Sequence, residues 1–400
     1  MNQARVGTAA LGALLLSGLP AMVQAADIRW NGFLDAAGAV SDTEEGAAYL
    51  GRIDQDGDFG DTTFGLNLNA LVNDEFRVAA QLTSNVTTEL HTAGGEEGRD
   101  VQGAQQLETV NLDWAVGHYE PNQHVTVRFG KLPFLARLIS DHKKVGYTYP
   151  WIRPPQVVYG SVYYSPALGL DAIKGASAAF GDSIGGVDYE FTVYGGSGRK
   201  VCDHDKMHAV RLDLGTDNLN LYAGYNRSQT HTDQEPFNQF IDGEWIQLMT
   251  GGGRYDNGKL LAYAEFMRNS PESKAPMGKG KIDLMTDAWY ATLGYRLFNR
   301  KLMPHVTYSK MAMYDANWGQ EAWTTGLRYE LRPGMALKAE WQAIQPQGFG
   351  IGLDGGDEDE VSFASSPGEA DRPYRYAGLT AGTTSEDPIN VYSLAVNVLF

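Results

Sequence analysis

The sequence predicts an all-β protein, a 16-stranded antiparallel transmembrane β-barrel whose third long loop folds inward. Three observations predict this fold. Apolar and polar residues alternate along many short segments, short and long connections alternate between those segments, and an export signal precedes them. Mean hydropathy is only -0.32, which a membrane barrel permits because only every second strand residue has to face lipid.

The N-terminus has the pattern of a secretory signal peptide over residues 1–25. A positive charge at Arg5 precedes an apolar run from Ala9 to Leu19, and Val23-Gln24-Ala25 provides small residues for cleavage. The run is too short to span a bilayer, and no other stretch approaches eighteen consecutive apolar residues. We therefore expect helical spans to be absent, residues 1–25 to be removed, and residues 26–400 to form one barrel in the bacterial outer membrane.

Alternation with period two identifies the strands. In the last segment Tyr392, Leu394 and Val396 share one face, and Ser393 and Ala395 share the other. Elsewhere the residues expected to face outward include Val110, Leu112, Trp114, Val116, Trp289 and Trp323. The predicted strands are 28–40, 61–72, 75–86, 107–117, 123–130, 168–180, 187–194, 207–214, 219–228, 244–254, 259–268, 286–298, 303–311, 321–331, 335–344 and 389–400.

Connection lengths provide an independent signal. Short turns at 73–75, 181–186, 215–218, 255–258 and 332–334 carry the Gly, Pro, Asn and Asp that tight reversals need. Eight longer segments lie between them, at 41–60, 87–106, 131–167, 195–206, 229–243, 269–285, 312–320 and 345–388. A secreted sandwich or propeller would also contain strands and turns, but soluble sheets rarely show this regular short–long alternation.

A barrel of sixteen strands encloses a lumen wide enough for water and small solutes. Charged residues at inward positions should line it, and basic and acidic residues are equally represented there. Two pairs, Arg211 with Asp213 and Arg328 with Glu330, are expected to neutralise each other. The candidate lumen-wall residues are Arg77, Asp113, Glu190, Arg211, Asp213, Arg296, Arg328 and Lys338.

The third long segment, 131–167, differs from the rest of this acidic chain, whose formal net charge is -17. Six Lys or Arg residues stand against Asp141 alone between Arg128 and Gly160. Prolines limit the movement of this loop and aromatic residues can pack against an inner wall, so we expect a rigid constriction loop inside the lumen. The candidate constriction residues are Arg128, Lys131, Arg137, Lys143, Lys144, Tyr147 and Arg153.

In these features the chain resembles the Gram-negative porin superfamily. The resemblance covers the signal peptide, the short–long alternation, the loop after the fifth strand and the terminal Phe400. It implies a channel for small hydrophilic solutes, a third loop that narrows the pore, and a homotrimer. The sequence "LPFLARLISDHKKVGYTYPWIRPP" lacks the Pro-Glu-Phe-Gly-Gly type motif of general enterobacterial porins, and its basic character suggests the anion-selective branch.

Two interpretations of the basic loop remain open. Unpaired cations at a narrow point would favour anions, because charges act strongly where the dielectric is low. Alternatively, the same cations pin the loop by ion pairs to inward carboxylates. The acidic balance of the chain argues against nucleic acid as a partner.

Other candidate sites are weaker. Asp54, Asp56 and Asp58 resemble part of a calcium loop but lack its later glutamate, so we expect solvated outer loops here and at 354–360, which divalent ions could bridge to lipopolysaccharide. The run "CDHDKMH" offers Cys202, Asp203, His204, Asp205 and His208 without the spacing of a zinc site. We therefore expect no cofactor and no bound metal.

An enzyme of the barrel-lipase or barrel-protease type is the alternative function. His231, Asp233 and His305 are available, but no spacing combines a nucleophile, a base and an orienting carboxylate. We expect no enzymatic activity.

Overall fold

The computed structural model describes residues 27–85, 110–160, 170–199, 202–231, 242–272, 275–277, 280–282, 285–314, 318–347, 376–377, 379–381 and 386–400. The predicted signal peptide, the acidic run 354–360 and Asp233 lie outside these residues. None of the helices in the described ranges is long and apolar enough to cross a membrane.

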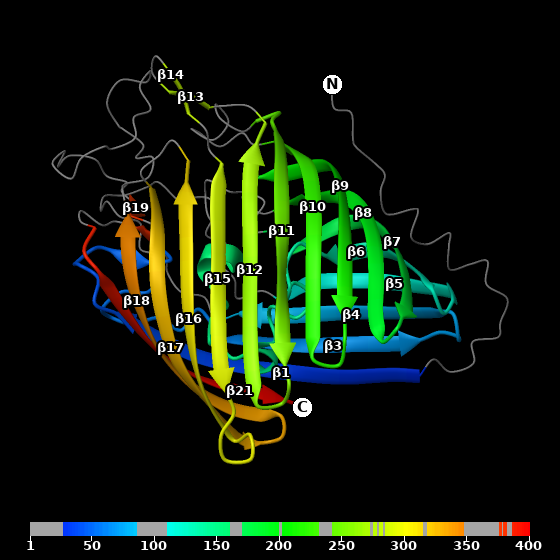
Figure 1. Ribbon diagram of the computed structural model, residues 1–400, viewed down its shortest axis with the longest axis horizontal. Helices are drawn as coiled ribbons and strands as arrows, with labels where there is room; N and C mark the ends of the chain where they lie inside the picture. The colour runs from blue at the N-terminus through cyan, green and yellow to red at the C-terminus, as the bar shows by residue number, and fades with distance from the viewer. Residues whose placement is uncertain are drawn as a thin grey trace, which may run out of the picture.

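Sixteen strands among the described residues close into one antiparallel barrel, which confirms the predicted fold class (Figure 1). They are β1 (Asp27–Ser41), β3 (Thr63–Leu71), β4 (Phe76–Asn85), β5 (Asn111–Asn122), β6 (Val125–Pro133), β7 (Ala172–Ile184), β8 (Val187–Arg199), β9 (Asp203–Gly215), β10 (Leu219–His231), β11 (Trp245–Asp256), β12 (Leu260–Pro271), β15 (Thr286–Tyr295), β16 (Leu302–Met313), β17 (Trp318–Arg332), β18 (Met335–Gln347) and β21 (Ile389–Leu399).

Each strand pairs with its neighbours along the chain, and β1 closes the barrel by pairing with both β3 and β21. Tight turns join the strands at one end, drawn at the right for β3–β6 and at the bottom for β9–β12 in Figure 1. Between β7 and β8 the turn residues Gly185 and Gly186 have φ of 61° and 83°, a conformation that glycine adopts without steric cost.

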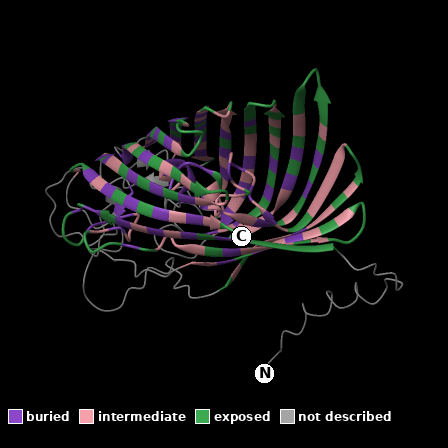
Figure 2. Ribbon diagram, turned by 90° about the horizontal axis from the view of Figure 1, so that it is seen from below, coloured by how far each residue is buried: buried purple, intermediate pink, exposed green. Residues whose placement is uncertain are grey.

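Burial alternates along the strands as the sequence predicts (Figure 2). On β21, Tyr392 and Leu394 are 53% and 69% exposed, whereas Ser393 and Ala395 are buried. On β17, Trp323, Leu327 and Tyr329 are exposed in the same way. Large apolar residues therefore cover the outside of the barrel, whereas its inside holds polar residues together with an internal apolar core.

The outward orientation predicted for Trp114 and Val116 is wrong. Residues 81–82 of β4 pair with Trp114 and Leu112, so the register shifts by one residue at Asp113. Because side chains alternate with period two, this bulge reverses the faces beyond it. Val116 is buried in the internal core, and the Trp114 indole donates to inward-facing Gln81.

Two of the predicted long connections are short, because the adjoining strands extend further. In the segment 195–206, β8 continues to Arg199 and β9 starts at Asp203. In the segment 312–320, β16 continues to Met313 and β17 starts at Trp318. The strands at β8–β9 and at β16–β17 are thus longer than the alternation of short and long connections predicts.

The remaining elements belong to the connections. A three-stranded sheet combines β2 (Ala48–Tyr49), β20 (Thr380–Ala381) and β19 (Tyr376–Ala377), and a two-stranded one pairs β13 (Ala275–Met277) with β14 (Gly280–Ile282). The connection after β6 contains the 3-10 helix η1 (Gly146–Thr148) and the short helix α2 (Gln156–Tyr159).

Candidate functional site

The connection after β6, described from residue 134 to residue 160, lies inside the barrel. Its helix α2 packs against β12, β15 and β16, and Figure 1 shows it behind β15. Phe134, Trp151 and Tyr159 are each only 1% exposed and belong to the same core as inward residues of the wall. The Trp151 ring lies 4.9 Å from that of Tyr263 and 5.6 Å from that of Tyr290. The protein core is therefore built between this loop and the lumen wall.

Glu265 on β12 is the first anchor of the loop. Its buried carboxylate accepts hydrogen bonds from the backbone N–H of Leu138 at 2.7 Å and from the hydroxyl of Tyr159. Two wall tyrosines, Tyr222 and Tyr290, each donate to it at 2.6 Å. One carboxylate thus joins two points of the loop to three strands of the wall.

A second anchor holds the segment around η1 against β1 and β18. The Lys338 ammonium, 3% exposed, donates to the carbonyl oxygens of Gly146 and Trp151, each at 2.6 Å. Asp35 accepts from the backbone N–H of Gly146 at 2.6 Å, and Glu340 accepts from that of Ile152 at 2.8 Å. These wall charges are satisfied by the main chain of the loop, which fixes its path across the lumen.

Two arginines predicted for the lumen wall hold the loop in the same manner. Arg211 forms the expected ion pair with Asp213 at 2.7 Å and also donates to the carbonyls of Leu135 and Arg137. Arg328 forms the expected pair with Glu330 at 3.1 Å, so both predicted pairs are confirmed. Arg328 also donates to the carbonyls of Tyr147 and Tyr149, and the hydroxyl of Tyr147 donates to Glu330.

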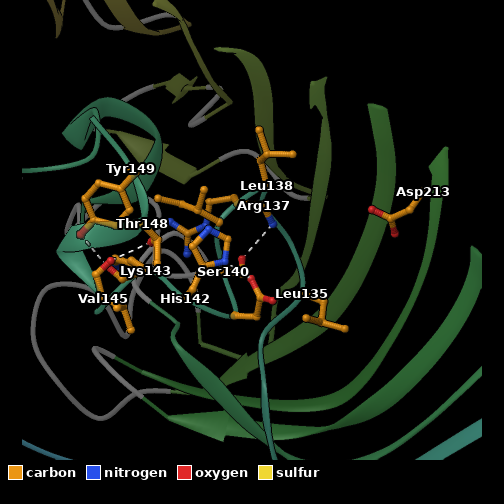
Figure 3. Close-up of polar contacts among 12 residues, drawn as sticks. Leu135, Arg137, Leu138, Ser140, His142, Lys143, Val145, Thr148, Tyr149 and Asp213 are labelled. Atoms are coloured by element: carbon orange, nitrogen blue, oxygen red, sulfur yellow. Dashed lines mark hydrogen bonds and ion pairs between the residues drawn. The ribbon is translucent and has the colours of Figure 1, made fainter. Parts of the chain in front are cut away.

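The basic residues of the loop face acidic or carbonyl oxygens. Lys143 pairs with Asp171 at 3.1 Å, Lys144 pairs with Asp113, and Arg153 pairs with Asp61 at 2.6 Å. Arg137 is 3% exposed and donates to the carbonyls of Val158 and Leu170. Figure 3 shows Arg137 and Lys143 within the curve of the strands, where the Arg137 N–H donates to Ser140 at 3.0 Å. These contacts favour the interpretation that the cations pin the loop.

Arg128 and Lys131 lie on β6, which extends to Pro133. Arg128 pairs in register with Ser177, a buried inward residue of β7, and therefore faces the lumen. Lys131 lies opposite exposed Lys174 in the β6–β7 register, and the next two cross-strand neighbours, Leu132 and Ile173, are buried in the core. Strand alternation thus places Lys131 on the outer face, where its ammonium donates to the Leu112 carbonyl. Lys144 of the loop and its partner Asp113 lie close enough for their charges to act on Lys131.

A basic row lies on the lumen wall away from the loop anchors. Arg77 on β4 is the cross-strand partner of His118 on β5, and His118 is that of Arg128 on β6. Arg77 pairs with Glu120 at 3.0 Å, and both side chains are about half exposed. Among the described residues Arg128 has no ion-pair partner, and its Nε atom is buried without an acceptor.

The last two predicted wall residues lie apart from this row. Arg296 forms a bidentate pair with Asp256, at 2.6 Å and 2.9 Å, and Asp256 also pairs with Arg254 at 2.7 Å. Glu190 accepts from the Thr192 hydroxyl at 3.2 Å and lies opposite Asp213 in the β8–β9 register.

At the end with the long connections, an ionic cluster joins the loop to the segment between β2 and β3. Asp61 forms ion pairs with both Arg153 and Arg52, and Arg52 also forms an ion pair with Asp58. Burial raises the pKa of Asp61, but the charges and hydrogen bonds of Arg52 and Arg153 outweigh it and hold this pKa below its usual value. Asp61 is therefore ionised when the loop is in place.

The residues considered as weaker metal-site candidates form contacts with nearby side chains and backbone groups. Asp54 accepts from the backbone N–H groups of Asp56 and Gly57 and so closes a turn. His204 is fully buried with Cys202 and Ser228, whereas Asp205 and His208 are exposed on the opposite face of β9. Within the described ranges, no three His, Cys, Asp or Glu residues are grouped so that they could hold a metal ion.

The two histidines considered for catalysis are also separated. His231 ends β10 and pairs with Asp242 at 3.5 Å. His305 is buried on β16, 3.7 Å from Glu340. Three strands, β11, β12 and β15, lie between β10 and β16 in the barrel.

The carboxylates that hold the loop are not among the predicted constriction residues; they are Asp35, Asp61, Glu265 and Glu340. For three of them a signal exists, because Asp35, Glu265 and Glu340 are acidic residues at inward positions of their strands. Asp61 lies in a connection, and nothing in its neighbourhood marks it.

No family model and no curated protein matches the chain. Solved structures do resemble it. OmpF of Salmonella typhi in complex with daunomycin has a TM-score of 0.56 at 11% identity, with 93% of this chain and 97% of that chain covered. An anion-selective porin from Comamonas acidovorans has a TM-score of 0.54 at 10% identity, with 94% and 100% covered.

OmpT of Vibrio cholerae, an outer-membrane protein in its trimer form, has a TM-score of 0.54 at 11% identity, with 94% of this chain and all of that chain covered. At such low identities the similarity concerns the fold. It extends over nearly the full length of both chains in each case. The chain thus shares its closed sixteen-strand barrel with outer-membrane porins of Gram-negative bacteria.

Proposed function

We propose that this protein is an outer-membrane porin, a water-filled channel through which small hydrophilic solutes diffuse passively. The observation that carries the proposal is the connection after β6, which lies inside the barrel and is fixed to the wall by buried charges. A sixteen-strand barrel alone would leave a wide opening. A rigid loop across that opening narrows it and thereby sets which solutes pass.

Anion preference is the second part of this proposal, and the basic row supports it. Three loop cations, Lys143, Lys144 and Arg153, are neutralised by Asp171, Asp113 and Asp61 respectively. Arg77 and Arg128, with His118 between them, face the lumen with Glu120 as the acidic partner of the row. A fixed net positive charge in a confined lumen attracts anions and repels cations.

Conductance of the purified protein in planar bilayers tests the proposal. We expect stepwise increases in conductance, and a reversal potential in asymmetric KCl that indicates anion preference. Arg128→Gln should reduce this preference. The neutral double variant Lys144→Gln/Asp113→Asn removes one charge of each sign and serves as the control, with unchanged selectivity expected. Absence of any conductance would refute the channel, whereas cation preference would refute only the anionic selectivity.

We also propose that the chain forms a homotrimer, as the trimeric form of OmpT does. The outer face of β1 and β3–β5 supports this, because it carries mainly small or aliphatic residues and so offers a flat surface for a second copy. These residues are Leu34, Ala36, Gly38, Val40, Leu66, Leu68, Ala70, Val78, Ala80 and Ala115. Three equal closing steps in single-channel records would support a trimer, and single steps only would contradict it.

The proposed porin is not an enzyme and carries no cofactor. The separation of His231 from His305 supports this part of the proposal. Hydrolysis of ester and peptide substrates by the purified barrel, abolished by His305→Ala or His231→Ala, would overturn it.

A further inference from the structure

The turn between β15 and β16, at the bottom of Figure 1, has an unusual backbone. Phe298, Asn299 and Arg300 have φ of 49°, 57° and 68°, and this left-handed conformation costs free energy at residues as large as Phe and Arg. Both hydrogen bonds of the Leu297–Leu302 pair close the turn, at 2.7 Å and 3.3 Å. Residues in such conformations cluster at functional sites, so the side chains of this turn are candidates for a binding role.

The turn presents an aromatic ring and a guanidinium group. Phe298 is 74% exposed, more than any other large hydrophobic side chain in the described ranges. The Arg300 guanidinium lies over Gly258 of the neighbouring β11–β12 turn, where a Cβ would come within 2.6 Å of it. Gly258 has a φ of 84°, so glycine both closes its own turn and leaves room for the guanidinium.

The short turns on this side of the barrel are basic. Residues 254–259, 296–301 and 328–332 contain seven Lys or Arg residues and two acidic ones. The other short turns, at 72–77, 118–125, 181–189 and 214–220, contain six acidic residues and Arg77 as their only Lys or Arg. The end of the barrel that carries the tight turns therefore has a basic side and an acidic side, although the chain has a formal net charge of -17.

Both acidic residues of the basic side are already paired. Asp256 pairs with Arg254 at 2.7 Å and with Arg296 at 2.6 Å, and Glu330 pairs with Arg328 at 3.1 Å. The other four cations of these turns are exposed and form no ion pair within the described ranges; they are Lys259, Arg300, Lys301 and Arg332. These four cations, together with Phe298, are called the basic turn patch below.

The two lysines of the patch face the mouth of the lumen. The strand residues next to Lys259 and Lys301 lie opposite Tyr295 and Tyr329, which are 46% and 41% exposed on the outer face. Because successive side chains alternate between faces, Lys259 and Lys301 lie on the inner face. Lipid headgroups surround the outer face, so the patch is better placed for a water-soluble partner.

We propose that the basic turn patch is a docking surface for an acidic peptide segment of a water-soluble partner protein, with an apolar side chain of that segment packed on Phe298. The inference rests on the proposed outer-membrane location, in which short turns face the periplasm. Carboxylates accept charge-assisted hydrogen bonds from Lys and Arg, and one Arg can bind a carboxylate through two such bonds. The acidic side of the same end repels the segment and so fixes where it binds.

Fluorescence anisotropy tests this surface, with the full mature chain in detergent and a short labelled peptide of Asp and Glu around a central Trp as the probe. We expect saturable binding by the wild type. Arg300→Ala/Lys301→Ala should bind the peptide roughly tenfold more weakly. Phe298→Ala should weaken binding of this peptide but not of one in which Ala replaces the Trp. The matched control Arg29→Ala/Lys206→Ala, which removes two exposed cations outside the patch, should bind like the wild type.

A glycine variant separates loss of binding from loss of folding. Glycine adopts the left-handed conformation without steric cost, so Phe298→Gly/Arg300→Gly should unfold on gels at a temperature no lower than the wild type. It should nevertheless lose peptide binding, because both side chains are absent. Unchanged peptide binding by this variant would overturn the proposal.

Three further results would also overturn the docking surface. The first is equal binding of a peptide in which Asn and Gln replace Asp and Glu. The second is loss of binding in Arg128→Gln with full binding in Arg300→Ala/Lys301→Ala, which would place the peptide in the lumen. The third is retention of phosphatidylglycerol in native mass spectrometry that depends on Arg300 and Lys301 and excludes the peptide, which would assign the patch to a lipid headgroup.

Bilayer conductance of the same variants separates this inference from the proposed function. We expect every patch variant to form channels, because the loop inside the barrel and its anchors are unchanged. Peptide binding without channels would leave the docking surface standing and refute the channel, whereas channels without peptide binding would refute only the docking surface.

Discussion

At the scale of single residues, the most informative group is Glu265. A buried carboxylate is costly unless hydrogen bonds replace its hydration. Here Tyr159, Tyr222, Tyr290 and the N–H of Leu138 provide four donors, so the charge is satisfied without a cation. The cost of burying the charge is recovered only when the loop is in place, which couples the position of the loop to this one side chain.

Replacing Glu265 should therefore loosen the loop. Glu265→Ala leaves buried tyrosine hydroxyls without acceptors, and we expect a loss of about 3 kcal/mol in stability. Glu265→Gln keeps part of the acceptor set and should lose less. The measurement is the temperature at which the folded band is lost on gels, together with single-channel noise. Glu190→Gln, which removes a wall carboxylate that does not touch the loop, is the control. An unchanged temperature and quiet channels in Glu265→Ala would contradict this anchoring.

The reactivity of the Cys202 thiol depends on its burial in the structure. Burial, followed by the negative charge of Asp203, raises the pKa of its thiol to about 12, and the thiolate is the reactive form. We expect no labelling of the folded protein by a maleimide at pH 7, and complete labelling after denaturation. Rapid labelling of the folded form, followed by mass spectrometry, would show that the thiol is accessible.

At the scale of elements, the period-two pattern predicts the strands well and their ends poorly. It predicts the faces of β9, β17 and β21, because each of these strands has one lipid-facing side. It fails at β5, because the bulge at Asp113 depends on pairing with β4 and leaves no mark in the local sequence. It also ends β6 one residue before Lys131, and this boundary error is why Lys131 was expected in the constriction.

The loop itself was predictable as an inward element, but its contacts were not. Prolines, aromatic residues and basic charge distinguish residues 131–167 from the acidic remainder. The carboxylate partner of each cation depends on how distant parts of the chain are arranged. Arg153, for example, donates to Asp61, which lies ninety-two residues earlier in the chain. A local sequence pattern contains no information about such long-range ion pairs.

The cluster of Asp61 with Arg52 and Arg153 should respond to acid. Because the folded pKa of Asp61 is lowered, its stabilising contribution is present above the unfolded pKa, about 3.9, and is lost as pH falls further. We expect channel noise to rise and thermal stability to fall below about pH 4. Asp61→Asn should show the weaker attachment already at pH 7 and a smaller change on acidification. An identical acid response in wild type and variant would assign the effect to other groups.

At the scale of the whole molecule, closure of the barrel requires the wall to bend, and a row of glycines allows it between β6 and β8. Gly130, Gly175 and Gly196 are cross-strand partners in succession. A Cβ added at Gly175 would overlap the carbonyl of Gly195, and Gly130 has a φ of 122°. Glycines at a sharp bend let neighbouring backbones approach where any side chain would collide.

Gly175→Ala should therefore impair assembly of the whole barrel. The new methyl group meets backbone atoms on the neighbouring strand, which cannot move aside as a flexible side chain can, so we expect a destabilisation of about 3 kcal/mol. The control is Gly251→Ala on β11, where a Cβ would meet the nearest atom, the Tyr222 carbonyl oxygen, at an ordinary 3.5 Å. The folded fraction after refolding into detergent, measured by heat-modifiable migration, should fall for Gly175→Ala and remain at the wild-type level for Gly251→Ala. Equal refolding of the two variants would mean that the wall bends without this row, and closure would then depend on strand twist distributed around the barrel.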